Sequence, residues 1–544
     1  MRFLYLFLLI FISSCSELMT KMNSNSNFNS PLEAHLDYSQ ANIFFSHNIS
    51  GETHPCGCRQ FPLGGLPQVY GFMKKSQEKN AYIYVDSGDT FFPSNKIPDT
   101  VKSSLSFAAK NLARGLDQLS LRYLTPGDQD FAMGIEFLDE IAKSSRFEFL
   151  ISNFNESESG KLKHTKFGQQ KIADAEYFFI GLIDPDTFLS EEKKYFKPIL
   201  ESLKDNLEEI KKLGYRSNNP RHRLIVLSHS GMEKDRELAL RFPQIDWIIG
   251  SHTQNFLRYS EDVGSVKIVQ VLSKNHYLGH IKSYLEKNKK FDQYEIVEIR
   301  DELSKLVQNN PLDDFIAQHK SQMNEWQLKE QSSLTSQNNL IHHNPELTNV
   351  VKKFPHPKTC INCHKVQGDF WQTTSHSIAY TTLINAKEQN NLSCIKCHSV
   401  GLDDPRGFST AKSIVGFKEK PITDYWMNAA SLGKHVKSVR QLPPNEIKKI
   451  SREWMKLDEK NKVKHNFANV QCLNCHTYYE EHPFNMQKDG DAYSDLDQKN
   501  LKQYQSKCVT CHTPDQSPEW YKKKNDLNEQ EFQRKLKKVS CPKL

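Results

Sequence analysis

Four copies of the pattern Cys-x-x-Cys-His lie in the last third of the 544-residue chain. Two cysteines at this spacing can form thioethers with both vinyl groups of one porphyrin, and the histidine that follows can bind the iron as an axial ligand. Zinc sites also use paired cysteines, but zinc does not require a histidine directly after every pair. The pattern therefore predicts four c-type haems, at Cys360, Cys363 and His364; Cys394, Cys397 and His398; Cys472, Cys475 and His476; and Cys508, Cys511 and His512.

The second axial ligand of each iron is less clearly marked in the sequence. Histidines near the motifs are candidates, and an ordinary surface imidazole is the alternative for each of them. These candidates are His356, His376, His435, His465 and His482. We favour His376 and His482.

The stretch from Cys360 to Pro518 contains CINCH, WQTTSHSIAYTTL, CIKCHSVGLDDPRGF, VQCLNCHTYYEEH and CVTCHTPDQSP. In this order the segments resemble the tetrahaem cytochrome c554 family. The resemblance implies that His376 and His482 are distal ligands. It also implies one five-coordinate haem, because Ser377-Ile378 departs from the family pattern and the Tyr521 region has no histidine.

Short apolar runs alternate with amphipathic stretches over residues 40–300, which predicts an α/β sandwich. Polar residues follow several of these runs, at Asp86–Asp89, Ser228–Gly231 and Gly250–Thr253. Ligands gather at strand ends in such folds, so we expect these residues to form one site. The expected strands are Ile43–Ser46, Tyr82–Asp86, Phe147–Ser152, Phe178–Ile183, Leu224–Ser228, Trp247–Gly250, Ile268–Leu272 and Tyr294–Ile299.

These polar runs resemble the calcineurin-like metallophosphoesterases, particularly the 5′-nucleotidase branch, which implies an αββα sandwich. Asp89 matches the metal-bridging aspartate of that family, and His229 and His252 match two of its histidines. Other positions depart from the family pattern. They are Asn48 and Ser50 in the opening Asp-x-His motif, Gln129 within Gly127–Asp130 in place of the catalytic histidine, and Gln254 in place of the last histidine.

Asp89, Asp128, His229 and His252 remain as a possible ligand set. Two carboxylates and two imidazoles suit one Zn²⁺, Mn²⁺ or Fe²⁺ ion. The substitutions argue against two-metal phosphoester hydrolysis, which clamps a phosphoryl group from both sides.

Cys56 and Cys58 follow directly after the altered first motif. His54-Pro-Cys-Gly-Cys58 resembles a Cys-Gly-Cys branch of the 5′-nucleotidase-like proteins that is often associated with multihaem cytochromes. The two thiols are candidates for soft metal ligands or for a redox-active thiol centre. The alternative is that both are small core residues.

The chain begins with Arg2, an apolar run from Phe3 to Ile12, and Cys15 after two serines. This pattern predicts a secretion signal, and the run is too short to span a bilayer. Ile12–Cys15 resembles a bacterial lipobox, which implies a lipid anchor at Cys15, a periplasm-facing lipoprotein of the outer membrane, or display at the cell surface. An ordinary secreted protein cleaved nearby is the alternative.

Composition and charge support a globular protein of several domains with no nucleic-acid site. The net charge is +7, and the tail Tyr521–Leu544 contributes +5 of it through eight Lys and Arg against three Asp and Glu. We expect a mostly α-helical, loop-rich haem domain after the sandwich. The expected boundaries are a signal peptide at 1–14, a lipid-anchored tether at 15–39, the phosphoesterase-like domain at 40–300, a helical connector and linker at 301–345, the tetrahaem domain at 346–520 and a basic tail at 521–544.

The leading hypothesis is an exported tetrahaem electron-transfer protein, with a redox partner protein or a quinol-linked electron chain as its partner. Its N-terminal domain would serve single-metal or thiol chemistry. The alternatives are an active metal-dependent phosphoesterase with an attached cytochrome, and a non-catalytic binding module. The expected cofactors are four haems and one divalent metal.

Overall fold

The computed structural model describes most of the chain from Ala41 onward. The described residues are 41–55, 62–77, 81–157, 162–172, 174–286, 288–341, 357–402, 404, 407–417, 424–434, 439, 442–476, 498–513, 516–523 and 526–542. None of the helices in these ranges is long and apolar enough to cross a membrane.

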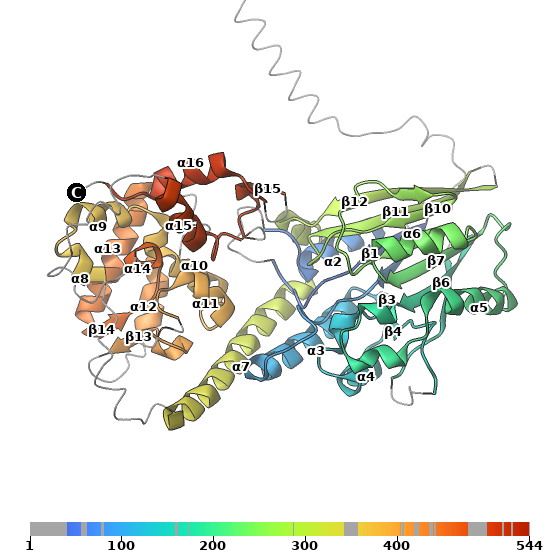
Figure 1. Ribbon diagram of the computed structural model, residues 1–544, viewed down its shortest axis with the longest axis horizontal. Helices are drawn as coiled ribbons and strands as arrows, with labels where there is room; N and C mark the ends of the chain where they lie inside the picture. Colours follow the sequence, from blue (N-terminus) through green and yellow to red (C-terminus); the bar gives the residue numbers. More distant parts are fainter. Residues whose placement is uncertain are drawn as a thin grey trace, which may run out of the picture.

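Two six-stranded sheets form the N-terminal part (Figure 1). The first has the order β12-β11-β1-β2-β3-β4, and β1 to β4 run parallel. Its strands are β1 (Ala41–Ser46), β2 (Tyr82–Asp86), β3 (Leu121–Leu124), β4 (Glu148–Phe149), β11 (Tyr277–Glu286) and β12 (Lys289–Glu298).

The second sheet has the order β5-β6-β7-β8-β10-β9, with β6, β7, β8 and β10 parallel. Its strands are β5 (Phe167–Ile172), β6 (Ala175–Ile183), β7 (His222–His229), β8 (Trp247–Gly250), β9 (Glu261–Val263) and β10 (Val266–Val269).

Alternation along the strands builds the layers, because successive side chains point to opposite faces. In β1, Ile43 and Phe45 join residues of both sheets in the core between them, whereas Phe44 joins a core beneath helices. Helices cover the outer face of each sheet: α2 (Leu66–Gln77), α3 (Lys102–Gln118) and α4 (Ile135–Ser144) on the first, and α5 (Ile199–Lys212) and α6 (Met232–Arg241) on the second. This helix–sheet–sheet–helix arrangement confirms the predicted αββα sandwich.

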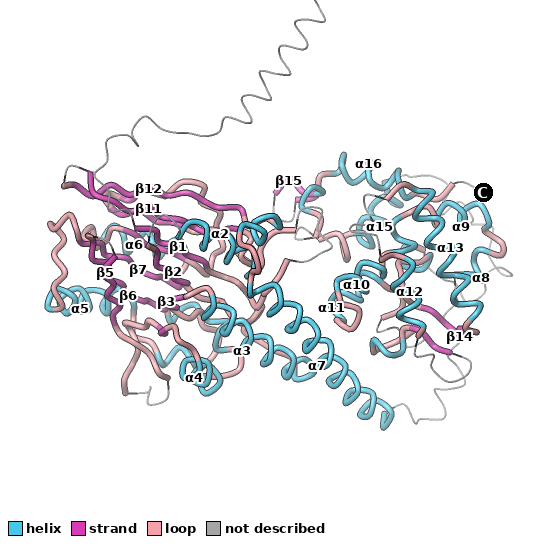
Figure 2. Tube along the Cα trace, turned by 180° about the vertical axis from the view of Figure 1, so that it is seen from behind, coloured by secondary structure: helices cyan, strands magenta, loops and turns pink. Residues whose placement is uncertain are grey.

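Helix α7 (Pro311–Ile341) runs from the sandwich to the C-terminal part (Figures 1 and 2). Its 31 residues give it a length of about 46 Å. Leu312 and Ile316 pack in the sandwich core. Farther along, the Gln331 side chain donates to the Asn390 carbonyl oxygen and accepts from the Ala411 backbone NH. One helix therefore contacts both parts of the chain.

The C-terminal part is mostly helical, as predicted, with short elements and many loops (Figure 2). A core around Tyr380, Ile395, Tyr425, Trp454 and Phe467 holds it together. Its helices are α8 (Pro357–Ile361), α9 (Lys365–Trp371), α10 (Tyr380–Ala386), α11 (Leu392–His398), α12 (Tyr425–Leu432), α13 (Pro444–Lys460), α14 (Cys472–Cys475), α15 (Gln498–Cys508) and α16 (Glu529–Val539), with small sheets from β13 (Val415–Phe417) and β14 (Val463–Asn466), and β15 (Tyr521–Lys523) and β16 (Asp526–Leu527).

Candidate metal centre and haem sites

Four side chains from separate strand ends meet in the sandwich. Asp89, Asp128, His229 and His252 each offer one ligand atom, and these atoms all lie within 4.8 Å of one another. Asp89 follows β2, His229 ends β7 and His252 follows β8. The structure thus brings together all four residues that the sequence analysis selected as metal ligands.

Asp128 stands between the two imidazoles. Its Oδ1 lies 3.1 Å from Nε2 of His229 and 3.2 Å from Nδ1 of His252. Asp89 Oδ1 lies 3.4 Å from the same Nε2 of His229. All of these atoms are separated by distances that one cation could bridge.

Hydrogen-bond partners at the second ring nitrogen, Nδ1, orient the ring of His229. Nδ1 lies 3.0 Å from the Ser87 carbonyl oxygen and 2.8 Å from the Ser251 hydroxyl. A hydrogen bond from Nδ1 to a backbone carbonyl fixes the tautomer in which Nε2 carries the lone pair. Nε2 is therefore the nitrogen that can bind a metal.

Charge in this cluster favours a cation. Burial opposes protonation of His229, but Asp89 and Asp128 outweigh it and raise the pKa of His229 to about 9. Burial likewise opposes ionisation of Asp128, yet the hydrogen bonds from His229 and His252 lower its pKa. A buried set of two carboxylates and two imidazoles fits one divalent ion such as Zn²⁺, Mn²⁺ or Fe²⁺.

Tight turns bring these residues together. A Cβ atom on Gly127 would lie 2.3 Å from both Asp89 Oδ1 and His229 Cε1. Asp89 and His252 adopt φ values of 55° and 69°, in the left-handed region that non-glycine residues rarely occupy. Such strain is typical of sites where the surroundings fix an unfavourable backbone.

Asp130 braces the loops that carry two of the ligands. Its Oδ1 accepts from the backbone NH groups of Thr90 and Phe91, both at 2.8 Å, and its Oδ2 accepts from Gly127 at 2.9 Å. Burial raises its pKa to about 7. The sequence predicts no role for Asp130, although its place at the end of the run Gly127–Asp130 is a signal that could have identified it.

The second metal position of the phosphoesterase pattern is altered in a specific way. Asn48 Nδ2 donates to Asp89 Oδ2 at 2.9 Å. This is the carboxylate that would bridge two metals, so an amide donor now lies against one of its oxygens. The side-chain oxygen Oε1 of Gln129 is buried and has no hydrogen-bond partner among the residues that the structure describes. Asn48 thus presents its NH2 group rather than its carbonyl oxygen to Asp89, and a neutral amide is a weaker ligand for a second cation than a carboxylate or an imidazole.

The haem motifs come together in two pairs. The thiol of Cys360 lies beside that of Cys472, which is the main cause of the lowered pKa of Cys360, so the first and third motifs adjoin. The thiols of Cys397 and Cys511 likewise lie side by side, so the second and fourth motifs adjoin as well. The Lys507 ammonium donates to the Cys475 carbonyl oxygen at 2.9 Å and links the two pairs.

Local structure suits covalent haem. Cys394 and Cys397 lie on α11, and Cys472 and Cys475 form α14, so each pair is separated by about one helical turn and shares a face. The His398 ring donates from Nδ1 to the Ala379 carbonyl oxygen at 2.7 Å, which makes Nε2 its iron-binding nitrogen. The described residues of the motifs therefore fit the thioether and axial-ligand roles of a c-type haem.

His376, a predicted distal ligand, lies among the haem histidines. Its ring centre is 6.4 Å from that of His512 in the fourth motif. The His512 ring stacks on Trp520 at 4.2 Å. In contrast, His465 directs Nε2 at the Ser413 carbonyl oxygen at 3.0 Å, which favours a structural role.

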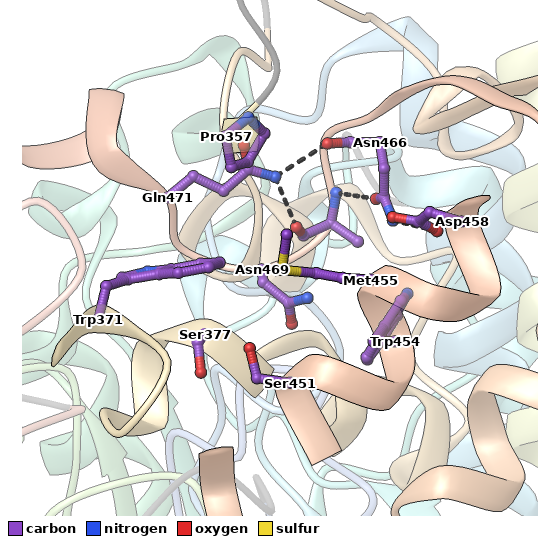
Figure 3. Close-up of a pocket in the computed structure, with 11 residues that line it drawn as sticks. Pro357, Trp371, Ser377, Ser451, Trp454, Met455, Asp458, Asn466, Asn469 and Gln471 are labelled. Carbon is purple, nitrogen blue, oxygen red and sulfur yellow. Dashed lines mark hydrogen bonds between the residues drawn. The ribbon is translucent and has the colours of Figure 1, made fainter. Parts of the chain in front are cut away.

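A pocket lies between the first and third motifs (Figure 3). Pro357 precedes Cys360 by three residues, and Gln471 directly precedes Cys472. Trp371, Trp454 and Met455 supply much of its apolar wall, and the Gln471 amide donates to the Asn466 and Ala468 carbonyl oxygens. Residues next to two haem motifs therefore line this pocket together with residues of α9 and α13.

Several predicted residues lie outside the described ranges. They are Cys15, Cys56, Cys58, His356, His435 and His482.

Comparison with known proteins supports both parts. Residues 359–418 match the family described as cytochrome c554 and c-prime. A curated relative named Protein 5NUC, from Lutzomyia longipalpis, is 28% identical over 202 residues, covering 36% of this chain and 33% of the relative. The 5′-nucleotidase of Mus musculus is 22% identical over 265 residues, or 43% of each chain.

Solved structures give similar matches. The 5′-nucleotidase precursor from Thermus thermophilus aligns with a TM-score of 0.43 at 18% identity, over 52% of this chain and 59% of that one. The calcineurin-like phosphoesterase YfkN from Bacillus subtilis aligns with a TM-score of 0.41 at 19% identity, over 53% and 98%.

The chain spans between a third and 43% of the length of these two curated relatives. It therefore shares a part of them, next to a region that they do not account for. The chain is therefore similar to 5′-nucleotidases over part of its length and to the cytochrome c554 and c-prime family over residues 359–418.

Proposed function

We propose that this protein is an exported tetrahaem c-type cytochrome that transfers electrons, fused to a remodelled phosphoesterase domain that holds one divalent metal. The observation that carries the proposal is the set of four Cys-x-x-Cys-His motifs, brought together in two pairs. Haems bound at motifs that adjoin in this way could exchange electrons, with potentials set by axial ligands and burial.

The N-terminal domain contributes a separate centre in this proposal. Asp89, Asp128, His229 and His252 would hold Zn²⁺, Mn²⁺ or Fe²⁺. The bound ion would supply Lewis-acid or redox chemistry, and Cys56 and Cys58 would add a thiol centre near it in the sequence. The Asn48 contact to Asp89 argues against a second metal.

We infer the location from the lipobox-like segment at Cys15 and the kind of partner from the haem motifs. A lipid anchor at Cys15 would hold the protein at a membrane facing the periplasm or at the cell surface. The partner would be a redox protein or a quinol-linked electron chain. Attachment of c-type haem suits an exported protein.

A reductive titration tests the electron-transfer proposal. The full-length, haem-loaded protein is titrated with a calibrated reductant while the haem absorbance is followed. Uptake of four electrons per chain is expected. Fewer than four with all haems loaded would mean that some irons are redox-silent, which would overturn the proposal.

A second candidate function is metal-dependent phosphoester hydrolysis. It is favoured by the convergence of four ligands and by relatives named 5′-nucleotidase. Its test is release of phosphate from a nucleoside monophosphate with added Mn²⁺ or Zn²⁺, compared with an Asp89→Asn variant. If the unaltered protein releases phosphate and the Asp89→Asn variant does not, while the haem spectra of both are the same, then the role of this domain is hydrolysis and not the single-metal chemistry proposed above.

A further inference from the structure

The two parts of the chain meet at a cluster of ionisable residues that includes none of the candidate metal ligands. His54 belongs to the sandwich, His319 and Lys320 to α7, and Glu388 to the loop between α10 and α11 of the cytochrome region. His54 Nε2 lies 3.2 Å from Glu388 Oε1, across 334 positions of sequence. This contact joins the sandwich directly to the loop that precedes the second haem motif.

The Glu388 carboxylate is shielded from water. Its side chain is 21% exposed. Burial opposes its ionisation, but the interactions with His54, Asn391 and Lys320 together outweigh that effect, and the pKa of Glu388 falls below its usual value. Glu388 therefore carries a negative charge at neutral pH in a setting where solvent screens it weakly.

A short chain of contacts connects Glu388 to the second haem motif. Asn391 Nδ2 donates to Glu388 Oε2 at 3.1 Å. The Asn391 carbonyl oxygen accepts from the backbone NH of Cys394 at 3.0 Å, and its side chain caps α11 at Ser393. The Glu388 charge reaches the Cys394 thiol, where it adds to burial in raising the pKa to about 12.

Residues outside the cytochrome region hold this loop in place. Asn324 of α7 donates to the Lys387 carbonyl oxygen, and Gln331 of α7 donates to that of Asn390 at 2.8 Å. The His54 ring lies edge-on to His319, with centres 6.2 Å apart. Among the described residues of the motifs, only the second motif has such a set of contacts to the sandwich and α7 close to its cysteines.

We propose that the haem bound at Cys394 and Cys397 is the one through which the N-terminal domain influences electron transfer, and that Glu388 is the positioning residue that links them. A carboxylate near a haem stabilises the ferric state, which carries one more positive charge than the ferrous state, so it lowers the reduction potential. The hydrogen bond from His54, on the sandwich, partly offsets the effect of this carboxylate. The proposal rests on the proposed function, since it requires haem at the second motif.

The test is a potentiometric titration of the full-length, haem-loaded protein. Glu388→Gln removes the charge and keeps the shape, so one of the four haem potentials should move upward. His54→Ala removes a donor to Glu388 and should move the potential of the same haem downward. In the double variant the effect of His54→Ala should vanish.

Glu459→Gln is the matched control. Glu459 is paired with Lys358 beside the first motif, but it is exposed, so water and salt should screen its charge. No potential should move in this variant. His54 lies in the sandwich, so His54→Ala tests the link even if Glu388→Gln disturbs the cytochrome fold.

The outcomes are distinguishable. Four loaded haems whose potentials are unchanged in both Glu388→Gln and His54→Ala, or all shifted together, would overturn the link alone. Fewer than four haems per chain in the unaltered protein would overturn the proposed function on which the link rests.

Discussion

At the scale of single residues, the candidate metal site centres on Asp128, which contacts both imidazoles. Asp128→Asn should weaken Zn²⁺ or Mn²⁺ binding by at least about tenfold, because an amide oxygen replaces an anionic ligand. Equilibrium dialysis with metal analysis measures this. The control is Asp262→Asn, an exposed aspartate paired with Lys267 that should bind metal as the unaltered protein does. Equal affinity in the two variants would show that Asp128 is not a ligand.

A second prediction at the scale of single residues concerns the substitution Gly127→Ala. The hydrogen of Gly127 lies where a Cβ would collide with Asp89 and His229, so Gly127→Ala should displace both ligands. We expect metal binding to fall at least about tenfold while the haem spectrum stays unchanged. If the metal affinity of Gly127→Ala is unchanged, the loop that carries residue 127 can move to accommodate the added methyl group, despite its close packing.

The ligands could be chosen from sequence because each stands in a recognisable motif at a strand end. The consequence of Asn48 could not, since only the folded chain shows that its amide faces Asp89 Oδ2. Asp130 was overlooked for a similar reason: its three backbone partners come from two loops that are distant in sequence.

At the scale of elements, His319 on helix α7 leads to a prediction about how the stability of the fold depends on pH. His319 on α7 is 4% exposed, accepts a hydrogen bond from Asn111 of α3 and stacks on Phe107. Burial, aided by His54, lowers its pKa from 6.5 to about 4. The folded state therefore favours neutral His319, and stability should be lost as the pH falls from about 6.5 to 4.

The expected loss is about 3 kcal/mol, because a shift of one pKa unit corresponds to 1.36 kcal/mol. His319→Phe, which retains the stacking but cannot be protonated, should lack this part of the pH dependence. Thermal unfolding of both proteins between pH 4 and 7 provides the comparison. If the unaltered protein and His319→Phe lose stability equally as the pH falls, His319 is not buried in its neutral form.

The strands show what local pattern can and cannot predict. Buried parallel strands such as β2 and β8 were predicted with the bounds that the structure has, because their apolar runs are continuous. The short β3 was missed, and β11 and the first half of β12 were missed as well. In β12 the residues are partly exposed or exposed, and charged residues weaken the apolar alternation.

At the scale of the whole molecule, the sequence indicated two kinds of domain but not how they meet. The motif spacings predict haem attachment locally, whereas the pairing of the first motif with the third and of the second with the fourth depends on tertiary structure. The contact between His54 and Glu388 likewise joins residues with no relation in sequence. Long-range contacts of this kind leave no local pattern.

The central claim is that this chain is a four-haem cytochrome with one further metal. The most direct test is elemental analysis of the mature, fully haem-loaded protein, counting iron and other transition metals per chain alongside covalent haem. The account predicts four covalent haems with four haem irons, and about one additional metal that Asp128→Asn removes. Fewer than four covalent haems would contradict the electron-transfer claim, and two additional metals would contradict the single-metal centre.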